Sequence, residues 1–119
     1  MRYAIYGAGA MGTVLGAYIA KAGVEIDLIN HNEAHVAALK EKGAQIVGKA
    51  QFTQRVNALL PSEMQGRYDI ILLFTKQRNN PEIVTFLKDH LAENGALCTC
   101  QNGLPEPGIA AIIGAERTY

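Results

Sequence analysis

Three glycines near the start of the chain are spaced so that the backbone between them could hold a phosphate. The stretch reads Gly7-Ala8-Gly9-Ala10-Met11-Gly12. A glycine at the first position permits a tight turn, the second lets the backbone approach a pyrophosphate, and the third lets a helix pack close to a strand. Unpaired N–H groups at the start of that helix would attract the phosphates. The spacing predicts a dinucleotide-binding turn; a strand–helix turn that binds nothing is the alternative.

The residues after the next expected strand bear on which dinucleotide binds. NAD-binding turns of this kind are followed, about 20 residues on, by an acid that bonds the ribose 2′-hydroxyl. Asn30 stands at that place, and Asp27 lies inside the expected strand. Without an acid there, a 2′-phosphate is not repelled, and His31 could add partial positive charge. We therefore expect NADPH in preference to NADH, with Asn30 and His31 contacting the cofactor. A solvated His31 in a capping loop is the alternative.

Two further polar groups follow expected strands later in the chain. Thr75-Lys76 follows a long apolar run, and Gln101-Asn102-Gly103 follows the next one. Open α/β sheets bind ligands at the carboxyl ends of their strands. A lysine there could reach the cofactor or a substrate carboxylate, and an asparagine amide both donates and accepts hydrogen bonds. We expect catalytic roles for Lys76 and Asn102 and cofactor contacts from all four of Thr75, Lys76, Gln101 and Asn102. A solvated lysine and an ordinary Asn-Gly turn are the alternatives.

Strands and helices must alternate to position these residues. We expect strands at 3–6, 26–29, 69–74 and 96–100, and helices at 10–22, from Asn30 or Asn32 to 42, 81–91 and 107–113. The alternation predicts an α/β fold of Rossmann type, with a doubly wound, mostly parallel sheet and helices on both faces. We expect a small hairpin or meander at 44–56, a connecting turn at 61–66 and the opening of another strand at 116–119. Large apolar side chains recur on one side of the first helix: Met11, Val14, Leu15, Tyr18 and Ile19.

Composition limits the class of protein. The 119 residues predict one domain, residues 1–119, and the 11 basic and 11 acidic residues leave no net charge to attract nucleic acid or a membrane surface. No apolar run reaches the roughly 20 residues of a membrane span. Cys98 and Cys100 share one face of an expected strand, so we expect buried, reduced thiols and no metal site. With no signal peptide expected, these features favour the cytoplasm.

Together the motifs resemble ketopantoate reductase (2-dehydropantoate 2-reductase), and specifically its N-terminal cofactor-binding domain. The resemblance rests on residues 7–12, on Thr75-Lys76, on Gln101-Asn102-Gly103-Leu104 and on the last stretch, 114–119. It implies NADPH-dependent reduction of the ketone of a 2-oxo acid, 2-dehydropantoate to pantoate, in pantothenate and coenzyme A biosynthesis. It also implies that Lys76 and Asn102 lie in the cleft for cofactor and substrate.

The chain departs from that family in three respects. His31 stands where the family has a phosphate-reading arginine, and Arg78 where an aromatic residue is common. The helical second domain, which carries the family's proton-donating lysine, has no counterpart in these 119 residues. We therefore expect a cofactor domain that does not turn over by itself, a 2-oxo acid as small-molecule partner, and no nucleic-acid or membrane partner; a homodimer is allowed. Alternatives are the cofactor domain of another hydroxy-acid or polyol-phosphate dehydrogenase, an NAD(P)-sensing module without catalysis, and a methyltransferase.

Overall fold

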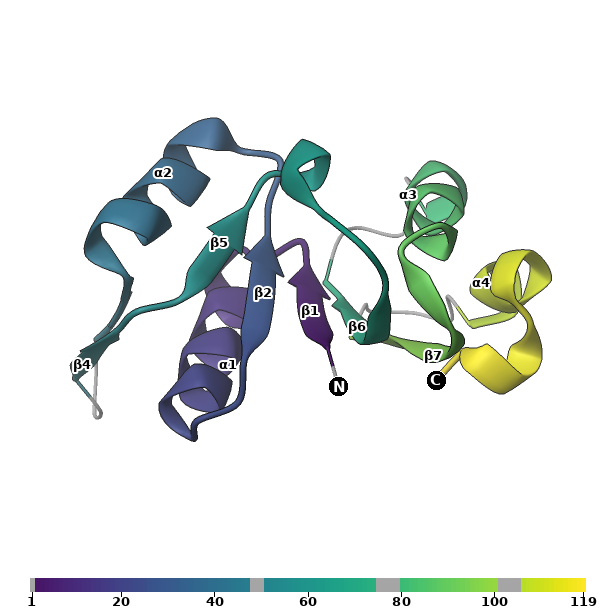
Figure 1. Ribbon diagram of the computed structural model, residues 1–119, viewed down its shortest axis with the longest axis horizontal. Coiled ribbons are helices and arrows are strands. Elements are labelled where there is room, and N and C mark those ends of the chain that lie inside the picture. Colours follow the sequence, from purple (N-terminus) through teal and green to yellow (C-terminus); the bar gives the residue numbers. More distant parts are fainter. Residues whose placement is uncertain (1, 48–50, 75–79, 101–105) are drawn as a thin grey trace.

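A computed structural model describes residues 2–47, 51–74, 80–100 and 106–119 of the chain. Its main sheet has five strands in the order β5-β2-β1-β6-β7 (Figure 1). The strands are β1 (Tyr3–Tyr6), β2 (Ile26–Ile29), β5 (Asn57–Leu59), β6 (Tyr68–Leu73) and β7 (Leu91–Thr99). Every pairing between these strands is parallel. The carboxyl ends of all five strands therefore lie along one edge of the sheet.

Helices cover both faces of this sheet. They are α1 (Ala10–Lys21), α2 (Glu33–Lys42), α3 (Asn80–Lys88) and α4 (Glu106–Ile113). Successive residues of β6 point to opposite faces. Leu72 packs with the cluster that contains Ile19 of α1, whereas Leu73 belongs to the buried cluster formed with α3 and α4. The predicted doubly wound Rossmann arrangement is thus confirmed.

Local signals account for the ends of α2. The side chain of Asn32 accepts a hydrogen bond of 3.0 Å from the backbone N–H of His35, so Asn32 is the N-cap and Asn30 is not. Gly43 ends the helix at a φ of 78°, which a residue with a side chain rarely adopts. The connection at Pro61–Glu63 forms one 3-10 turn, as the proline suggested.

The region between α2 and β6 is confirmed in part. A hairpin forms from β3 (Ala44–Ile46) and β4 (Phe52–Gln54), which pair antiparallel. The next strand, β5, was not predicted; it pairs parallel with β2 and forms the edge of the main sheet. Its three residues carry no alternating pattern, and only Ala58 is buried. A short strand whose partner lies about 30 residues away leaves no local signal.

In the second half of the chain, the ends of the helices and strands also differ from those expected. Helix α3 ends at Lys88 and β7 begins at Leu91, earlier than expected. The pairing of β7 with β6 skips residues, because Tyr68 pairs with Leu91 and Ile70 pairs with Ala96. At the end of the chain, 115–117 form a 3-10 turn, and Thr118 makes a parallel bridge to Leu97. The expected strand at 116–119 is thus represented by an isolated bridge.

The large apolar side of α1 is mostly exposed, contrary to the usual expectation for an amphipathic helix. Met11 is 77% exposed and Val14 is 42% exposed. The buried side consists of small residues, and a Cβ atom on Gly16 would lie 2.8 Å from Cδ1 of Leu28. The helix approaches the sheet too closely for large side chains there. The large side chains of α1 point outward instead. Together with Phe74 they line an apolar groove of about 500 Å³; the lining residues are Met11, Val14, Leu15, Tyr18 and Phe74.

Candidate dinucleotide-binding site

The glycine turn joins the end of β1 to the start of α1. Gly7 has a φ of 86°, so the first glycine is required by the turn itself. The N–H groups of Gly7 and Ala8 both donate to the carbonyl of Ile29, at 2.8 and 2.9 Å, and the N–H of Gly9 donates to the carbonyl of Gly7 at 2.7 Å. The two bonds to Ile29 hold the turn against the end of β2, where the ribose of a dinucleotide would bind.

The other two glycines have different reasons to lack a side chain. A Cβ atom on Gly12 would lie 3.1 Å from Cγ2 of Ile5, so Gly12 permits close packing of α1 on β1, as predicted. Gly9 has a φ of −80°, and among the described residues a Cβ atom placed there would meet only the Gly7 carbonyl oxygen, at 4.0 Å. Packing within the described part of the chain therefore does not require a glycine at this position. The open space in front of Gly9 is where a pyrophosphate would approach.

The first turn of α1 follows Gly9 and leaves backbone N–H groups without acceptors in the helix. The first hydrogen bond that continues into the helix runs from the N–H of Thr13 to the carbonyl of Gly9, at 2.9 Å. The N–H groups of residues 10–12 precede it and have no acceptor within the helix. Free N–H groups at a helix N-terminus are the kind of donors that bind phosphate oxygens.

The loop after β2 lies beside the glycine turn. The N–H of Asn30 donates to the carbonyl of Leu59 at 3.1 Å, and its side-chain oxygen accepts from the N–H of Asn32 at 2.8 Å. His31 is exposed at the tip of this loop. The structure thus brings Asn30 and His31 to the same edge of the sheet as Gly9, with no acid at the end of β2.

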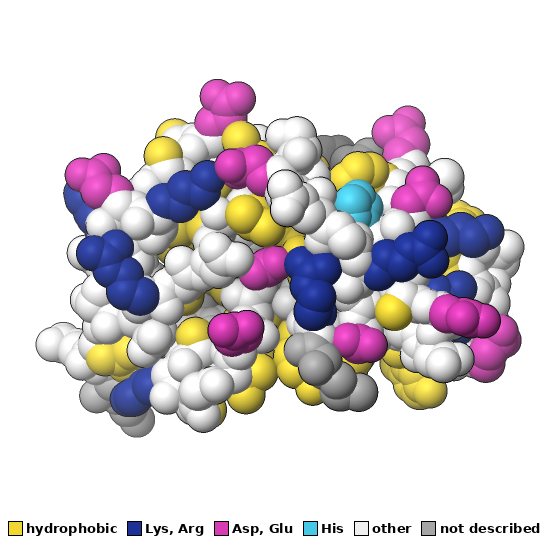
Figure 2. Space-filling view, in the orientation of Figure 1, with side chains coloured by type: hydrophobic (Ala, Val, Ile, Leu, Met, Phe, Trp, Pro, Cys, Tyr) yellow, Lys and Arg dark blue, Asp and Glu magenta, His cyan; other side chains and the backbone are white. Residues whose placement is uncertain are grey.

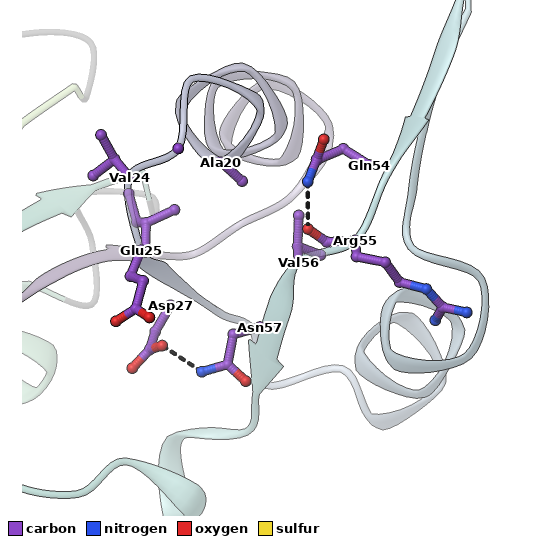
Figure 3. Close-up of a pocket in the computed structure, with 10 residues that line it drawn as sticks. Ala20, Val24, Glu25, Asp27, Gln54, Arg55, Val56 and Asn57 are labelled. Atoms are coloured by element: carbon purple, nitrogen blue, oxygen red, sulfur yellow. Dashed lines mark hydrogen bonds between the residues drawn. The ribbon is translucent and has the colours of Figure 1, made fainter.

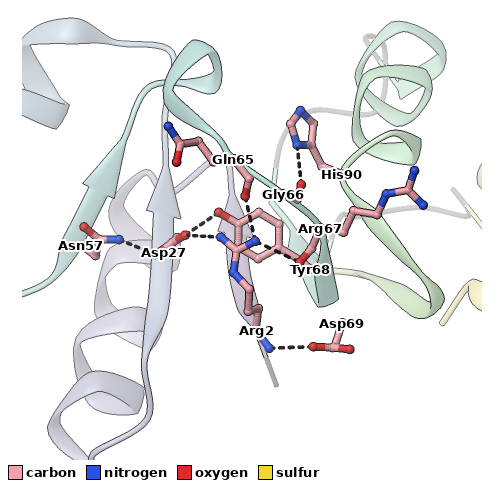
Figure 4. Close-up of polar contacts among 9 residues, drawn as sticks. All are labelled: Arg2, Asp27, Asn57, Gln65, Gly66, Arg67, Tyr68, Asp69 and His90. Atoms are coloured by element: carbon pink, nitrogen blue, oxygen red, sulfur yellow. Dashed lines mark hydrogen bonds and ion pairs between the residues drawn. The ribbon is translucent and has the colours of Figure 1, made fainter.

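Asp27 is engaged in a different part of the molecule (Figure 4). Its carboxylate accepts hydrogen bonds from the hydroxyl of Tyr68 and from Nδ2 of Asn57, and it lies 3.7 Å from the guanidinium of Arg2. Burial, and then the neighbouring Asp27 carboxylate, raise the pKa of Tyr68 well above its ordinary value. Asp27 is therefore a structural acid and not the missing ribose ligand.

The residues expected on the nicotinamide side, Thr75, Lys76, Gln101 and Asn102, lie outside the described residues. The strand ends that precede them are described. The N–H of Phe74 donates to the carbonyl of Tyr6 at 2.9 Å, and the N–H of Cys100 donates to the carbonyl of Leu73 at 2.8 Å. Phe74 therefore lies beside the end of β1, and Cys100 beside the end of β6, both at the carboxyl edge of the sheet.

A separate pocket of about 430 Å³ opens at the opposite edge of the sheet (Figure 3). Residues that lead into β2 and β5 line it, among them Glu25 and Arg55. Its Asp27 and Asn57 side chains bond each other, and Gln54 bonds the carbonyl of Arg55. This pocket lies far from the strand ends that carry the predicted site residues.

The chain has two cysteines. Cys98 and Cys100 are both free, as expected, but neither is buried as expected: Cys98 is half-buried and Cys100 is exposed. The described residues contain no group of three metal-binding side chains, and in the same part of the chain no helix is long and apolar enough to cross a membrane. Basic and acidic side chains are interspersed over the face in Figure 2, with no field of one sign.

Sequence reasoning assigned no role to His35, and the structure shows that it contacts the glycine turn. Its Nε2 atom lies 2.8 Å from the carbonyl oxygen of Ala8. No local sequence pattern predicts a contact between His35 and Ala8, which lie far apart in the sequence. The position of His35 near the start of α2, directly after the loop at Asn30, was the only available hint.

Comparison with known proteins places the chain in a family. Residues 3–118 match the family model for ketopantoate reductase PanE/ApbA. The chain belongs to this family. The 2-dehydropantoate 2-reductase of Streptococcus pyogenes is 31% identical over 84% of the chain, and that of Pyrococcus abyssi is 34% identical over 87%. The chain spans only 33% and 34% of the length of these two relatives.

Solved structures of ketopantoate reductases and of a related dehydrogenase have the same fold. A 2-dehydropantoate 2-reductase from Geobacter metallireducens superposes with a TM-score of 0.86 at 29% identity, over 99% of the chain and 40% of its own length. D-mandelate dehydrogenase, solved with NADH and anilino(oxo)acetate, superposes with a TM-score of 0.87 at 27% identity, over 99% of the chain and 39% of its own. The glycine turn therefore belongs to the Rossmann portion of a ketopantoate reductase-family protein.

Proposed function

We propose that this chain is the NADPH-binding domain of a cytoplasmic oxidoreductase that reduces the ketone of a 2-oxo acid, with 2-dehydropantoate as the substrate and pantoate as the product. The observation that carries the proposal is the space in front of Gly9, which no described residue fills. Membership of the ketopantoate reductase family supports the reaction class.

Different residues would contact different parts of the proposed cofactor. The N–H groups of residues 10–12 would hold the pyrophosphate, and Gly9 would admit it. Asn30 would bond the adenosine ribose, and exposed His31 would meet the 2′-phosphate. The bound nicotinamide would supply the hydride for the ketone carbon. Lys76 would hold the substrate carboxylate by charge, and Asn102 would orient the carbonyl by hydrogen bonding.

Turnover needs a proton for the developing alkoxide oxygen as well as the hydride. The chain matches about a third of the length of its curated relatives. We therefore assign the proton donor, and most of the substrate pocket, to sequence beyond these 119 residues. On this proposal the chain binds the cofactor but does not reduce 2-dehydropantoate at enzyme-like rates by itself.

A second candidate function is that of an NADH-dependent 2-hydroxy-acid dehydrogenase. It is favoured by the similarity to D-mandelate dehydrogenase, which was solved with NADH. His31 is the residue that bears most directly on the choice, because it stands where a 2′-phosphate would be read. Tighter binding of NADH than of NADPH would favour the second candidate.

Calorimetric titration of the chain with NADPH and with NADH tests the proposal. The sharpest variant is Gly9→Asp, because aspartate is a good N-cap residue and its charge would repel a pyrophosphate. We expect Gly9→Asp to weaken both cofactors at least tenfold, by about 1.4 kcal/mol or more, without lowering the melting temperature.

Gly108→Asp is the matched control. No described atom lies within 4 Å of a Cβ atom placed on Gly108, which is in α4, away from the turn. The same added charge there should leave both affinities unchanged. If the chain bound neither cofactor, or if Gly9→Asp bound them as well as Gly108→Asp does, the proposal would be wrong.

A further inference from the structure

The side chain of His35 reaches back from α2 to the glycine turn. Its Nε2 atom lies 2.8 Å from the carbonyl oxygen of Ala8 and 3.5 Å from Oγ1 of Thr13. The Thr13 hydroxyl donates to the same Ala8 carbonyl at 3.1 Å. A carbonyl oxygen can only accept, so Nε2 of His35 carries a proton and donates it. One buried carbonyl is thus held by two side chains from two different helices.

These contacts determine the orientation of one peptide group. The peptide between Ala8 and Gly9 has its carbonyl held by His35 and Thr13, and its N–H donates to the carbonyl of Gly7 at 2.7 Å. Both polar ends of the group are bonded, and Ala8 is fully buried. Rotation of this peptide would turn the N–H groups that follow it at the start of α1.

We propose that His35 is a positioning residue for the dinucleotide. It holds the Ala8 carbonyl so that the first-turn N–H groups of α1 stay directed at the pyrophosphate. This inference rests on the proposed function, since it presumes that the open space in front of Gly9 takes a pyrophosphate. It differs from the proposed role of His31, which would contact the cofactor directly.

The same residue connects the turn to the loop that would read the ribose. The backbone N–H of His35 donates to Oδ1 of Asn32 at 3.0 Å, and the N–H of Asn32 donates to Oδ1 of Asn30 at 2.8 Å. The hydrogen-bonded path therefore runs from Ala8 through His35 to Asn30. Loss of the His35 ring removes the first step of this path and leaves the backbone steps in place.

The two histidines should differ in their effect on cofactor choice. The pyrophosphate is common to NADH and NADPH, so removal of the His35 side chain should weaken both by the same factor. We expect His35→Ala to raise the dissociation constants of both cofactors 3- to 10-fold. We expect His35→Gln to stay within twofold of the unaltered chain, because the glutamine amide can donate to the Ala8 carbonyl.

His90→Ala is the matched control, since His90 also lies within hydrogen-bond distance of a backbone carbonyl. Its Nδ1 atom is 3.0 Å from the carbonyl oxygen of Gly66, away from the turn. This variant should leave both affinities unchanged. The positioning role is refuted if His35→Ala binds both cofactors normally, if it loses only NADPH, or if His35→Gln is no better than His35→Ala.

A readout without ligand separates this inference from the proposed function. In the ligand-free chain, His35→Ala should speed amide hydrogen exchange at Gly9 several-fold, because the Ala8–Gly9 peptide loses one of its restraints. The same amide should be unaffected in His90→Ala. If the chain binds neither cofactor but Gly9 responds in this way, the proposed function fails and the restraint of the turn by His35 stands. If Gly9 does not respond, the restraint itself is wrong.

Discussion

The hydroxyl of Tyr68 donates a hydrogen bond to the carboxylate of Asp27, joining β6 to β2 across the intervening strand β1. Asn57 of β5 donates to the same carboxylate from the other side (Figure 4). The guanidinium of Arg2 lies 4.2 Å from the centre of the Tyr68 ring. A single acid thus connects strands from both halves of the sheet, at a distance from the glycine turn.

Removal of the Tyr68 hydroxyl should weaken the fold. In Tyr68→Phe, the partly buried Asp27 carboxylate keeps its charge and loses one donor. Hydrogen bonds to charged groups contribute about 1.5–3 kcal/mol, so we expect a loss of that size in the free energy of unfolding at neutral pH. Urea denaturation followed by circular dichroism measures it. Cofactor affinity should not change, and a loss below about 0.5 kcal/mol would mean that solvent replaces the hydroxyl.

Alkaline pH should reveal the same interaction. The pKa of Tyr68 is raised in the folded chain, first by burial and then by Asp27. The unfolded chain ionises this tyrosine near pH 10, so the stabilisation is fully present below about pH 10 and is lost as the pH rises through the folded pKa. Above about pH 10, the urea midpoint of the unaltered chain should therefore fall more steeply than that of Tyr68→Phe. Parallel curves would contradict the assignment.

His31→Glu should change cofactor preference. An acid at the end of β2 repels a 2′-phosphate and can accept a hydrogen bond from a ribose 2′-hydroxyl. We expect NADPH binding to weaken by about 1–2 kcal/mol more than NADH binding, the scale of one charge-assisted contact. Fluorescence titration with both cofactors measures the difference. His31→Gln, which adds no charge, should show a smaller shift, and equal losses for both cofactors in His31→Glu would argue against a phosphate contact.

The two sides of α1 should respond in opposite ways to changes in size. Gly16→Val places atoms against the buried Leu28 side chain, and overpacking of this kind costs about 1–3 kcal/mol. Val14→Ala, two residues earlier on the exposed side, should change stability by less than about 0.5 kcal/mol, because alanine favours the helix and little packing is lost. Thermal unfolding of both variants tests the contrast. A larger loss for Val14→Ala would show that this side of α1 is covered in solution.

The local features of the fold could be predicted from the sequence. The glycine turn, the caps at Asn32 and Gly43 and the long apolar strand β6 depend on neighbours within a few residues. Their backbone geometry is set by the absence or presence of a nearby side chain. The absence of an acid at the end of β2 could likewise be predicted, since it depends on the spacing from the turn.

Contacts between distant segments required the tertiary structure. The order of strands, the existence of β5 and the outward direction of Met11 depend on which elements approach one another and how closely. The contacts of His35 and Asp27 are likewise contacts between distant segments, and they required the tertiary structure. The sequence by itself determined that residues 7–12 form a glycine turn between a strand and a helix. Only the fold decided that His35 holds this turn and that Asp27 bonds Tyr68, because both contacts arise from the close packing of segments far apart in the chain.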